Sequence, residues 1–168
     1  MKLTSIEAVV RALDAAQVLY IVVGGIAVVL HGYGRSTYDL DIVLKLDRAN
    51  VLAAFAALKP LGYRPRVPIT ADQFANAEIR NRWIEEKGMM VLNLHSDQHQ
   101  ETNIDLFVTE PFDFEKEYRA AYLQELIPGM PLRVASLDML IAMKRSAGRQ
   151  KDLADVDELL KIKGVLRG

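Results

Sequence analysis

The chain contains no cysteine, which excludes disulfides, zinc–thiolate sites and a thiol nucleophile. Its formal net charge is only −1 at pH 7, so no overall positive field draws in nucleic acid, and any RNA contact must use local patches. The apolar stretches are too short to cross a bilayer. Glu7, Arg11 and Asp14 interrupt the apolar run that a signal peptide would need. We therefore expect a cytoplasmic protein without a membrane partner.

The composition is that of an ordinary globular domain. Of the 168 residues, 51% are hydrophobic and 26% are charged, which is enough to form one hydrophobic core. No internal repeat, low-complexity segment or Ser/Pro-rich linker divides the chain. We therefore expect a single domain over 1–168, with a core of about 1–135 and a helical C-terminal part of about 136–168.

Hydrophobic periodicity and capping signals predict the order of the elements. Helices alternate with strands at first and strands then cluster, which predicts an α/β (α+β) fold with a small mixed β-sheet, flanking helices and C-terminal helices. Capping boxes at Thr4 and Thr70 are expected to open helices that reach about residues 17 and 86. The second of these carries Arg80, Arg82 and Trp83 on a face expected to be solvated, with the Trp as an anchor. The remaining expected helices cover 48–58, 112–122, 137–147 and a final helix that buries Leu153, Val156 and Leu160, and the expected strands cover 19–23, 39–43, 89–94, 103–108 and 132–135.

The segment 23–43 is the centre of the functional argument. It reads as the end of an apolar strand, the pair Gly24-Gly25, a short apolar helix, a loop and a second strand. The two glycines lack a Cβ, so a ligand can approach their backbone closely. Free N–H groups at the start of the following helix favour an anion. This part of the segment therefore predicts a phosphate site.

The second strand of this segment carries Asp39-Leu40-Asp41. Residues i and i+2 of a strand share a face, so both carboxylates point the same way while Leu40, Ile42 and Leu44 point into the core. Two like charges so placed repel each other unless a cation lies between them. Mg²⁺ prefers such oxygen ligands together with phosphate, so the pair predicts a magnesium–nucleotide site.

The spacing of these residues is similar to a known signature. Gly24-Gly25, thirteen further residues and Asp39-Leu40-Asp41 resemble the polymerase-β-like nucleotidyltransferase superfamily. The fuller string, with His31-Gly32 and Arg35-Ser36-Thr37, resembles its AbiEii-type branch, which includes toxins of type IV toxin–antitoxin systems. The string around Lys144, Gly148 and Arg149 also resembles that branch.

The resemblance implies an activity and its residues. The implied reaction is metal-dependent transfer of a nucleoside monophosphate from an NTP, such as ATP, to an acceptor hydroxyl. Asp39, Asp41 and Asp105 would hold two Mg²⁺ ions, and the nucleotide would be bound by Gly24, Gly25, Arg35, Thr37, Lys144 and Arg149. The acceptor would be RNA, for example a tRNA, and an antitoxin protein would be a partner. A protein or small-molecule acceptor, or a catalytically silent nucleotide-binding regulatory or antitoxin module, remains the alternative.

Asp105 is chosen as the third carboxylate because of its surroundings. It lies between Ile104 and Leu106 in an apolar strand, where an ionised side chain needs a partner or a metal. Asp97 and Asp113 lie in loop-like segments and fit less well. A strand-end salt bridge is the structural alternative for Asp105.

Lys144 continues the apolar stripe of Leu137, Leu140 and Ile141, so its ammonium should emerge at the edge of the core. It needs an anion there, which could be Asp152, Asp155 or a triphosphate. If Lys144 is structural and its acidic partner stays solvated, Lys144→Met should be neutral or stabilising. If Lys144 is functional, as we expect, the same change should leave the melting temperature near that of the wild type and weaken NTP binding by about 1.5–3 kcal/mol.

His31 follows the short apolar helix and precedes Gly32. A hydrogen-bonded structural role and a catalytic role are equally compatible with this position.

Overall fold

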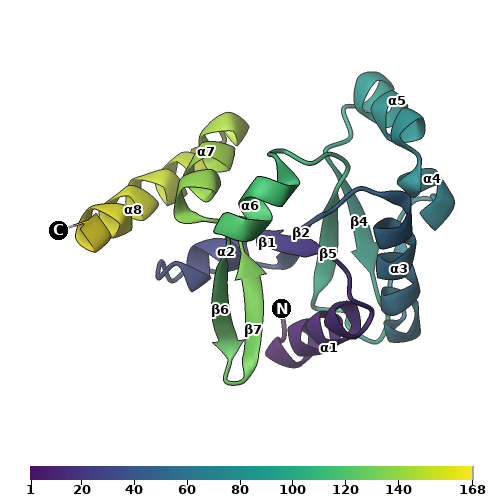
Figure 1. The fold of residues 1–168 in the computed structure, drawn as a ribbon, viewed down its shortest axis with the longest axis horizontal. Helices are drawn as coiled ribbons and strands as arrows, with labels where there is room; N and C mark the ends of the chain where they lie inside the picture. Colours follow the sequence, from purple (N-terminus) through teal and green to yellow (C-terminus); the bar gives the residue numbers. More distant parts are fainter. Residues whose placement is uncertain (168) are drawn as a thin grey trace.

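A seven-stranded mixed sheet runs through the molecule, and helices pack against it (Figure 1). The computed structural model describes residues 1–167. The strands are β1 (Tyr20–Val23), β2 (Asp39–Leu44), β3 (Arg64–Pro65), β4 (Val91–His95), β5 (Asn103–Phe107), β6 (Tyr122–Ile127) and β7 (Met130–Val134), in the order β3-β4-β5-β2-β1-β7-β6. The helices are α1 (Leu3–Ala15), α2 (Gly24–Leu30), α3 (Arg48–Leu58), the short 3₁₀ helix η1 (Lys59–Leu61), α4 (Ala71–Ala75), α5 (Ala77–Lys87), α6 (Phe114–Ala120), α7 (Leu137–Ala147) and α8 (Gln150–Arg167). The predicted α/β class with a mixed sheet is confirmed.

The register of the central strands brings the acidic residues together. β1 and β2 are antiparallel with Val23 opposite Asp41, so the chain leaves β1 beside the start of β2. β2 and β5 are parallel, with Asp41 opposite Asp105. Gly24, Asp41 and Asp105 therefore meet at one end of three neighbouring strands.

The C-terminal helices reach the same end of the sheet. β7 runs parallel to β1, with Val22 opposite Val134, and Ala135 N–H donates to the Val22 carbonyl over 3.0 Å. Ser136 caps α7, as the sequence predicts, by accepting from Met139 N–H. Parallel strands end at the same edge, so α7 starts next to the end of β1. In Figure 1, α8 continues from α7 away from the body of the molecule.

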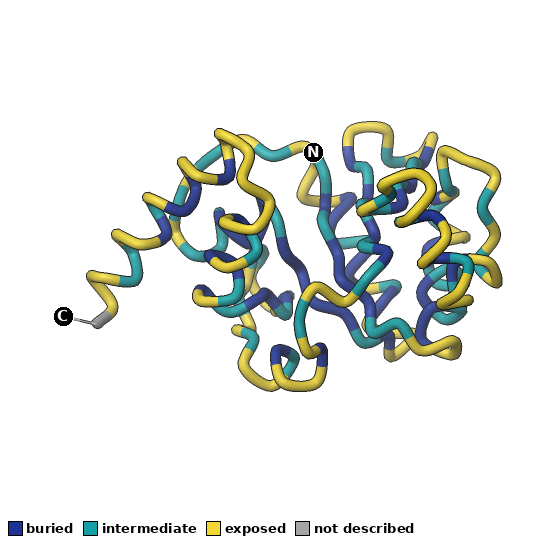
Figure 2. The backbone as a smooth tube through the Cα atoms, turned by 90° about the horizontal axis from the view of Figure 1, so that it is seen from above, coloured by how far each residue is buried: buried dark blue, intermediate teal, exposed yellow. Residues whose placement is uncertain are grey.

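The core lies on the strands and on the inner faces of the helices that cover them (Figure 2). All four residues of β1 are buried, and so are Leu40, Ile42 and Leu44 of β2, as predicted. Each fully buried side chain of this kind stabilises the fold by about 1.5–3 kcal/mol. The acidic residues of β2 alternate with this buried set, so the core fixes the direction in which they point.

His31 has a structural contact at the end of α2. Its Nε2 donates to the Ala135 carbonyl over 2.8 Å, and its ring meets Tyr122 edge-on. The hydrogen bond joins the end of α2 to the segment that leads into α7. Gly32 follows at φ 105°, as expected for the residue that ends this helix.

The two predicted capping boxes have different outcomes. Helix α1 already begins at Leu3, with Lys2 at its N-cap and no side-chain cap, so the box at Thr4 is wrong. The box at Thr70 is confirmed, because Thr70 and Gln73 cap each other. The helix that it opens is interrupted at Asn76, which caps α5 by accepting from Ile79 N–H.

The break between α4 and α5 also buries a charge. Arg80 was expected on a solvated face, but it is 6% exposed and donates to the carbonyls of Phe74 (2.5 Å) and Val108 (3.1 Å). Because α4 ends at Ala75, the Phe74 carbonyl lacks a helical N–H donor, and the Arg80 guanidinium donates to it instead. Trp83 is buried as the predicted anchor.

Two predictions about the C-terminal part are wrong. The hairpin strand β6 was not foreseen, and the helix expected over 112–122 is limited to α6. Leu153 and Leu160 were expected to be buried, but they are 48% and 39% exposed, while Val156 and Leu159 are buried instead. The buried face of α8 also carries Asp152 and Asp155, which face Lys144 of α7. The charge contacts, which hydrophobic periodicity does not report, therefore set the rotation of this helix.

No helix within residues 1–167 combines the length and the apolar character needed to cross a bilayer. Residue 168 of the expected C-terminal part lies outside the described residues.

Candidate active site

A cavity of about 700 Å³ opens where the ends of β1, β2 and β5 meet α7. All nine side chains or backbones predicted to form the site line it, namely Gly24, Gly25, Arg35, Thr37, Asp39, Asp41, Asp105, Lys144 and Arg149. The acidic groups of this set come from β2 and β5, and its basic groups come from the α2–β2 loop, from α7 and from the residue before α8. The fold therefore gathers the whole predicted set, while the role of each residue stays a prediction.

The three carboxylates form a cluster of negative charge that Lys144 and Arg66 offset only in part. Burial raises the pKa of Asp41 to about 6, and the charges of Asp105 and Asp39 add to this shift. The Gly25 backbone N–H donates to Asp41 and partly offsets it. Burial likewise raises the pKa of Asp105, against a hydrogen bond from Asn93. A cation at this place would remove the repulsion.

The chemistry of these donors suits a hard divalent ion. All are carboxylate oxygens, which Mg²⁺ prefers, and no imidazole is among them. Across residues 1–167, no three acidic or histidine side chains are already gathered around a common point as a finished metal site. The raised pKa of Asp41 is the observation that favours a cation, because the charges of Asp105 and Asp39 add to the effect of burial and the charge of Lys144 offsets them only in part.

The two glycines make room for side chains of the protein itself. A Cβ on Gly24, which has φ 66°, would overlap the Asp41 carboxylate. A Cβ on Gly25 would overlap Thr37 and lie 2.7 Å from Arg35 Nη2. The sequence predicted that these positions let a ligand approach, whereas in this structure Asp41, Thr37 and Arg35 occupy the space.

We expect Gly24→Ala to destabilise the protein and to displace Asp41. The left-handed backbone costs a non-glycine residue about 1–2 kcal/mol, and the overlap with the carboxylate adds to this loss. Urea denaturation measures the effect. Gly34→Ala is the matched control, since no atom lies within 4 Å of its Cβ position and its φ is not positive. Equal stability of the two variants would contradict the expected strain.

Buried ion pairs form the basic side of the cavity. Lys144 is 7% exposed, and its Nζ lies 3.0 Å from Asp152 Oδ1 and 2.7 Å from Asp155 Oδ2. Arg35 Nη1 lies 3.4 Å from the same oxygen of Asp155. Arg149 Nε donates to Asp152 Oδ2 over 2.5 Å. The two aspartates thus hold the basic residues in place, and both are among the anions that the sequence offered as partners of Lys144.

The basic groups differ in how freely they can meet a ligand. The Arg149 side chain is 62% exposed, whereas that of Lys144 is 8% exposed and lies between two carboxylates. Burial alone would raise the pKa of Asp152, but hydrogen bonds from Arg149 and Lys144 outweigh it and hold that pKa below its usual range. Arg35 Nε is buried without a hydrogen-bond partner in the part of the chain that the structure describes. Arg149 and Arg35 are therefore better placed than Lys144 for an incoming anion.

Sequence reasoning missed the apolar wall of the cavity and the polar residues behind the carboxylates. The wall consists of Met90, Phe107, Pro111, Met139, Leu140, Ala142 and Met143. Behind the carboxylates, Asn93 and Asn103 donate to Asp105 and Asp39. A signal for the amides was present, because Asn103 shares a strand face with Asp105 by the period of two.

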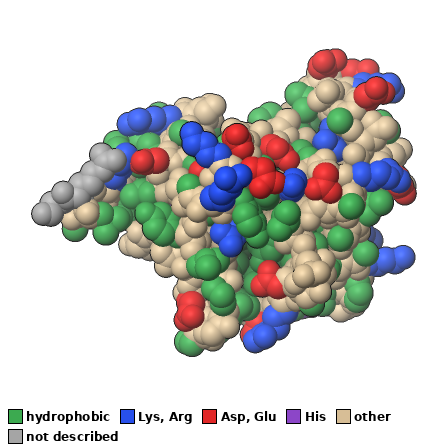
Figure 3. Space-filling model, viewed as in Figure 1, with side chains coloured by type: hydrophobic (Ala, Val, Ile, Leu, Met, Phe, Trp, Pro, Cys, Tyr) green, Lys and Arg blue, Asp and Glu red, His purple; other side chains and the backbone are tan. Residues whose placement is uncertain are grey.

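The surface of the molecule shows the same arrangement of charge. On the face seen in Figure 1, acidic side chains gather near the middle and basic side chains lie on either side of them (Figure 3).

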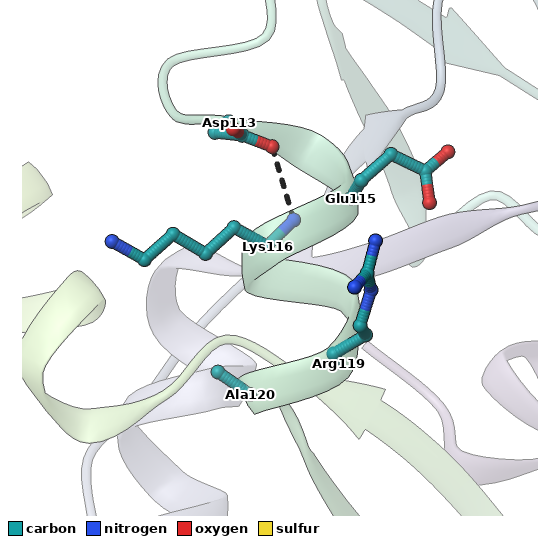
Figure 4. A pocket seen from close by; sticks show the side chains of 5 residues that line it. All are labelled: Asp113, Glu115, Lys116, Arg119 and Ala120. Atoms are coloured by element: carbon teal, nitrogen blue, oxygen red, sulfur yellow. Dashed lines mark hydrogen bonds between the residues drawn. The ribbon is translucent and has the colours of Figure 1, made fainter.

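A second, more open hollow of about 420 Å³ lies along α6 (Figure 4). There, Lys116 and Glu115 point away from each other, and Asp113 accepts from Lys116 N–H as the helix cap. The second hollow therefore lacks converging reactive groups.

Comparisons with known proteins give structural matches alone. No protein-family model matches the chain, and no curated protein matches its sequence. LnuA, a lincosamide antibiotic adenylyltransferase in a lincomycin-bound crystal structure, is similar with a TM-score of 0.63 and 14% identity, covering 96% of this chain and 98% of its own.

The antibiotic-resistance factor ANT(2'')-Ia is similar in two structures. Its solution structure has a TM-score of 0.60 and 13% identity, covering 98% of this chain and 90% of its own. Its crystal structure with adenylyl-2''-tobramycin has a TM-score of 0.56 and 13% identity, covering 98% and 95%. The matches run over almost the whole chain and include both the sheet and the C-terminal helices. The chain therefore has the nucleotidyltransferase fold.

Proposed function

We propose that this protein is a metal-dependent nucleotidyltransferase that moves a nucleoside monophosphate from an NTP to an acceptor hydroxyl. One observation carries the proposal: Asp39, Asp41 and Asp105 line the same cavity as Arg35 and Arg149. Negative groups that suit a cation therefore share one cavity with positive groups that suit a triphosphate. The similarity of fold to adenylyltransferases supports the same reaction class.

The residues that line the cavity would have different roles in binding the NTP. Arg149 is largely exposed and Arg35 has a buried donor without a partner, so both would bind phosphate oxygens. Lys144 would hold Asp152 and Asp155 in place and so position the two arginines. Thr37 and the Gly24–Gly25 turn would shape the floor beneath the phosphates.

Asp39, Asp41 and Asp105 would hold Mg²⁺, two ions being the expected number. Bound there, the metal supplies activation of the acceptor hydroxyl and neutralisation of the leaving pyrophosphate. The protein contributes by directing the three carboxylates to one side of the sheet. Arg35 and Arg149 would orient the NTP for the reaction.

Two acceptor classes are proposed. RNA, including tRNA, follows from the resemblance of the Gly24–Asp41 and Lys144–Asp155 strings to the AbiEii-type branch, where a toxin role and an antitoxin partner would apply. A small hydroxylated molecule is the second candidate. It is favoured by the apolar wall of the cavity and by the full-length similarity to LnuA and ANT(2'')-Ia, whose structures contain lincomycin and an adenylylated tobramycin. A silent nucleotide-binding module is disfavoured because all three carboxylates are present.

The test is transfer of label from each α-labelled NTP with Mg²⁺ or with EDTA. The acceptor arms are total RNA, purified tRNA, a lincosamide, an aminoglycoside and no acceptor. We expect label to move to one acceptor class in Mg²⁺ alone. Label on the 3′ end of RNA supports the toxin proposal, and label on an antibiotic supports the small-molecule proposal. Absence of NTP binding by calorimetry together with absence of transfer would refute the proposed function.

A further inference from the structure

Arg66 lies immediately after β3, the strand at one edge of the sheet. The strands β7 and β6, which precede α7 and α8 in the chain, form the other edge. Its backbone N–H donates to the Asn93 carbonyl over 3.1 Å, which fixes it beside β4. Its guanidinium donates to two amide oxygens, those of Asn93 on β4 and Asn103 on β5, the second over 3.0 Å. One exposed side chain thereby joins polar residues on two neighbouring strands.

Each of these amides in turn holds a carboxylate. Asn93 Nδ2 donates to Asp105 Oδ1 over 2.7 Å, and Asn103 Nδ2 donates to Asp39 Oδ1 over 3.3 Å. Both contacts are between residues directly opposite each other in the sheet. The third carboxylate, Asp41, receives the Gly25 backbone N–H instead. Every acidic group of the cluster thus accepts from one neutral donor.

The direction of the amides depends on Arg66. A guanidinium can only donate, so it attracts the oxygen of each amide and leaves the NH₂ group to face the other way. If the amides flipped, their oxygens would face the carboxylates and would add repulsion to an already negative cluster. An arginine suits this task because its planar fork reaches two acceptors, whereas a lysine ammonium is a single point charge.

We propose that Arg66 is a positioning residue that fixes the side-chain amides of Asn93 and Asn103 and, through them, aims Asp105 and Asp39 at a bound cation. In Asp105 and in Asp39 the amide bonds to Oδ1, which leaves Oδ2 for a metal. Outer hydrogen bonds of this kind orient metal ligands and commonly change metal affinity 10–100-fold. The inference rests on the proposed function, because it assigns the carboxylates to a metal.

The experiment compares Arg66→Ala and Arg66→Lys with Arg64→Ala in the full chain. Arg64 is a matched control, since it precedes Arg66 by two residues, is similarly exposed and pairs with Asp97 outside the network. Mn²⁺ binding in the presence of a non-hydrolysable ATP analogue is measured by electron paramagnetic resonance. We expect Arg66→Ala to weaken Mn²⁺ about tenfold or more, Arg66→Lys to fall between it and the wild type, and Arg64→Ala to bind like the wild type.

A second readout separates positioning from general damage. Arg66→Ala should lower kcat at saturating Mg²⁺–NTP with little change in KM for the nucleotide, and its melting temperature should match that of Arg64→Ala. Mn²⁺ affinity of Arg66→Ala within twofold of the wild type would overturn the inference while leaving the proposed function standing. Absence of Mn²⁺ binding in the wild type and in Arg64→Ala would overturn both.

Discussion

Asp41→Asn should abolish nucleotidyl transfer and at the same time make the metal-free protein more stable at neutral pH. Transfer should fall by about 10³-fold or more, because a charged oxygen that would hold the metal is lost, and metal stabilisation is worth several kcal/mol. The stability gain follows from the cluster itself. Burial and the charges of Asp105 and Asp39 all disfavour the ionised form of Asp41. A neutral amide at this position carries no charge and so avoids all three effects. The amide oxygen can still accept from Gly25 N–H.

The pH dependence gives the sign of this effect. The pKa of Asp41 is about 6 in the folded protein and 3.8 for an unperturbed aspartate, so between these two pH values the folded state binds more protons than the unfolded state. The contribution of Asp41 to stability is therefore most favourable below pH 3.8 and is lost as the pH rises through 6. The loss is about 3 kcal/mol at most. In EDTA, Asp41→Asn should remove this part of the pH dependence and exceed the wild type in stability at pH 7.

Urea denaturation between pH 4.5 and pH 7.5 measures this prediction. Asp97→Asn is the control, because Asp97 is exposed and its pKa is lowered by a hydrogen bond from Arg64, so its loss should bring no gain in stability. The control should also keep full transfer activity. A destabilised or active Asp41→Asn protein would contradict the assignment of Asp41 to an acidic cluster whose charge is offset only in part.

Lys144→Met should destabilise the protein by about 3 kcal/mol, the lower end of the cost of breaking a buried ion pair, because Asp152 keeps Arg149 and Asp155 keeps only the more distant Arg35 as partners. Asp152 and Asp155 are 0% and 2% exposed, and both lie against Lys144. The sequence-based expectation that the change is neutral or stabilising for a structural Lys144 assumed a solvated acidic partner, and the burial of both aspartates makes that assumption wrong. NTP binding should fall as well, because the two arginines would lose their braced positions.

Chemical denaturation with a matched variant tests the role of Lys144. Lys151→Met, at an exposed position that also lines the cavity, should change stability by no more than about 0.5 kcal/mol. The double variant Lys144→Met/Asp155→Leu should recover part of the loss, since it removes the buried carboxylate that keeps only the 3.4 Å contact with Arg35. An unchanged melting temperature of Lys144→Met would show that Asp152 and Asp155 are satisfied by other groups.

The parts of the site that the sequence predicts are those controlled by local pattern. Gly24 through Asp41 lie within one strand–helix–strand segment, and the period of two in β2 sets the direction of both carboxylates. Asp105 stands out because it interrupts an apolar strand. The chain brings these residues together through short connections and through buried strands whose register the core enforces.

The parts that the sequence did not predict depend on contacts between distant segments. Arg66 reaches Asn93 and Asn103 only because β3, β4 and β5 are neighbours in a particular register. The rotation of α8 is set by buried charges that its apolar residues do not reveal. Arg80 is buried because α4 ends early and leaves a carbonyl that needs a donor. None of these contacts leaves a periodic signal in a single segment.

The parallel pairing of β1 with β7 has a consequence for the order of folding. Val22 and Val134 are far apart in the sequence, and closing such a long loop is entropically costly and slow. The hairpins β1–β2 and β4–β5 need only shorter connections. We expect the acidic half of the cavity to assemble first and the basic half, on α7 and α8, to dock afterwards. Nucleotide binding would then report completion of the fold, and a nascent chain would lack it until both helices had been synthesised.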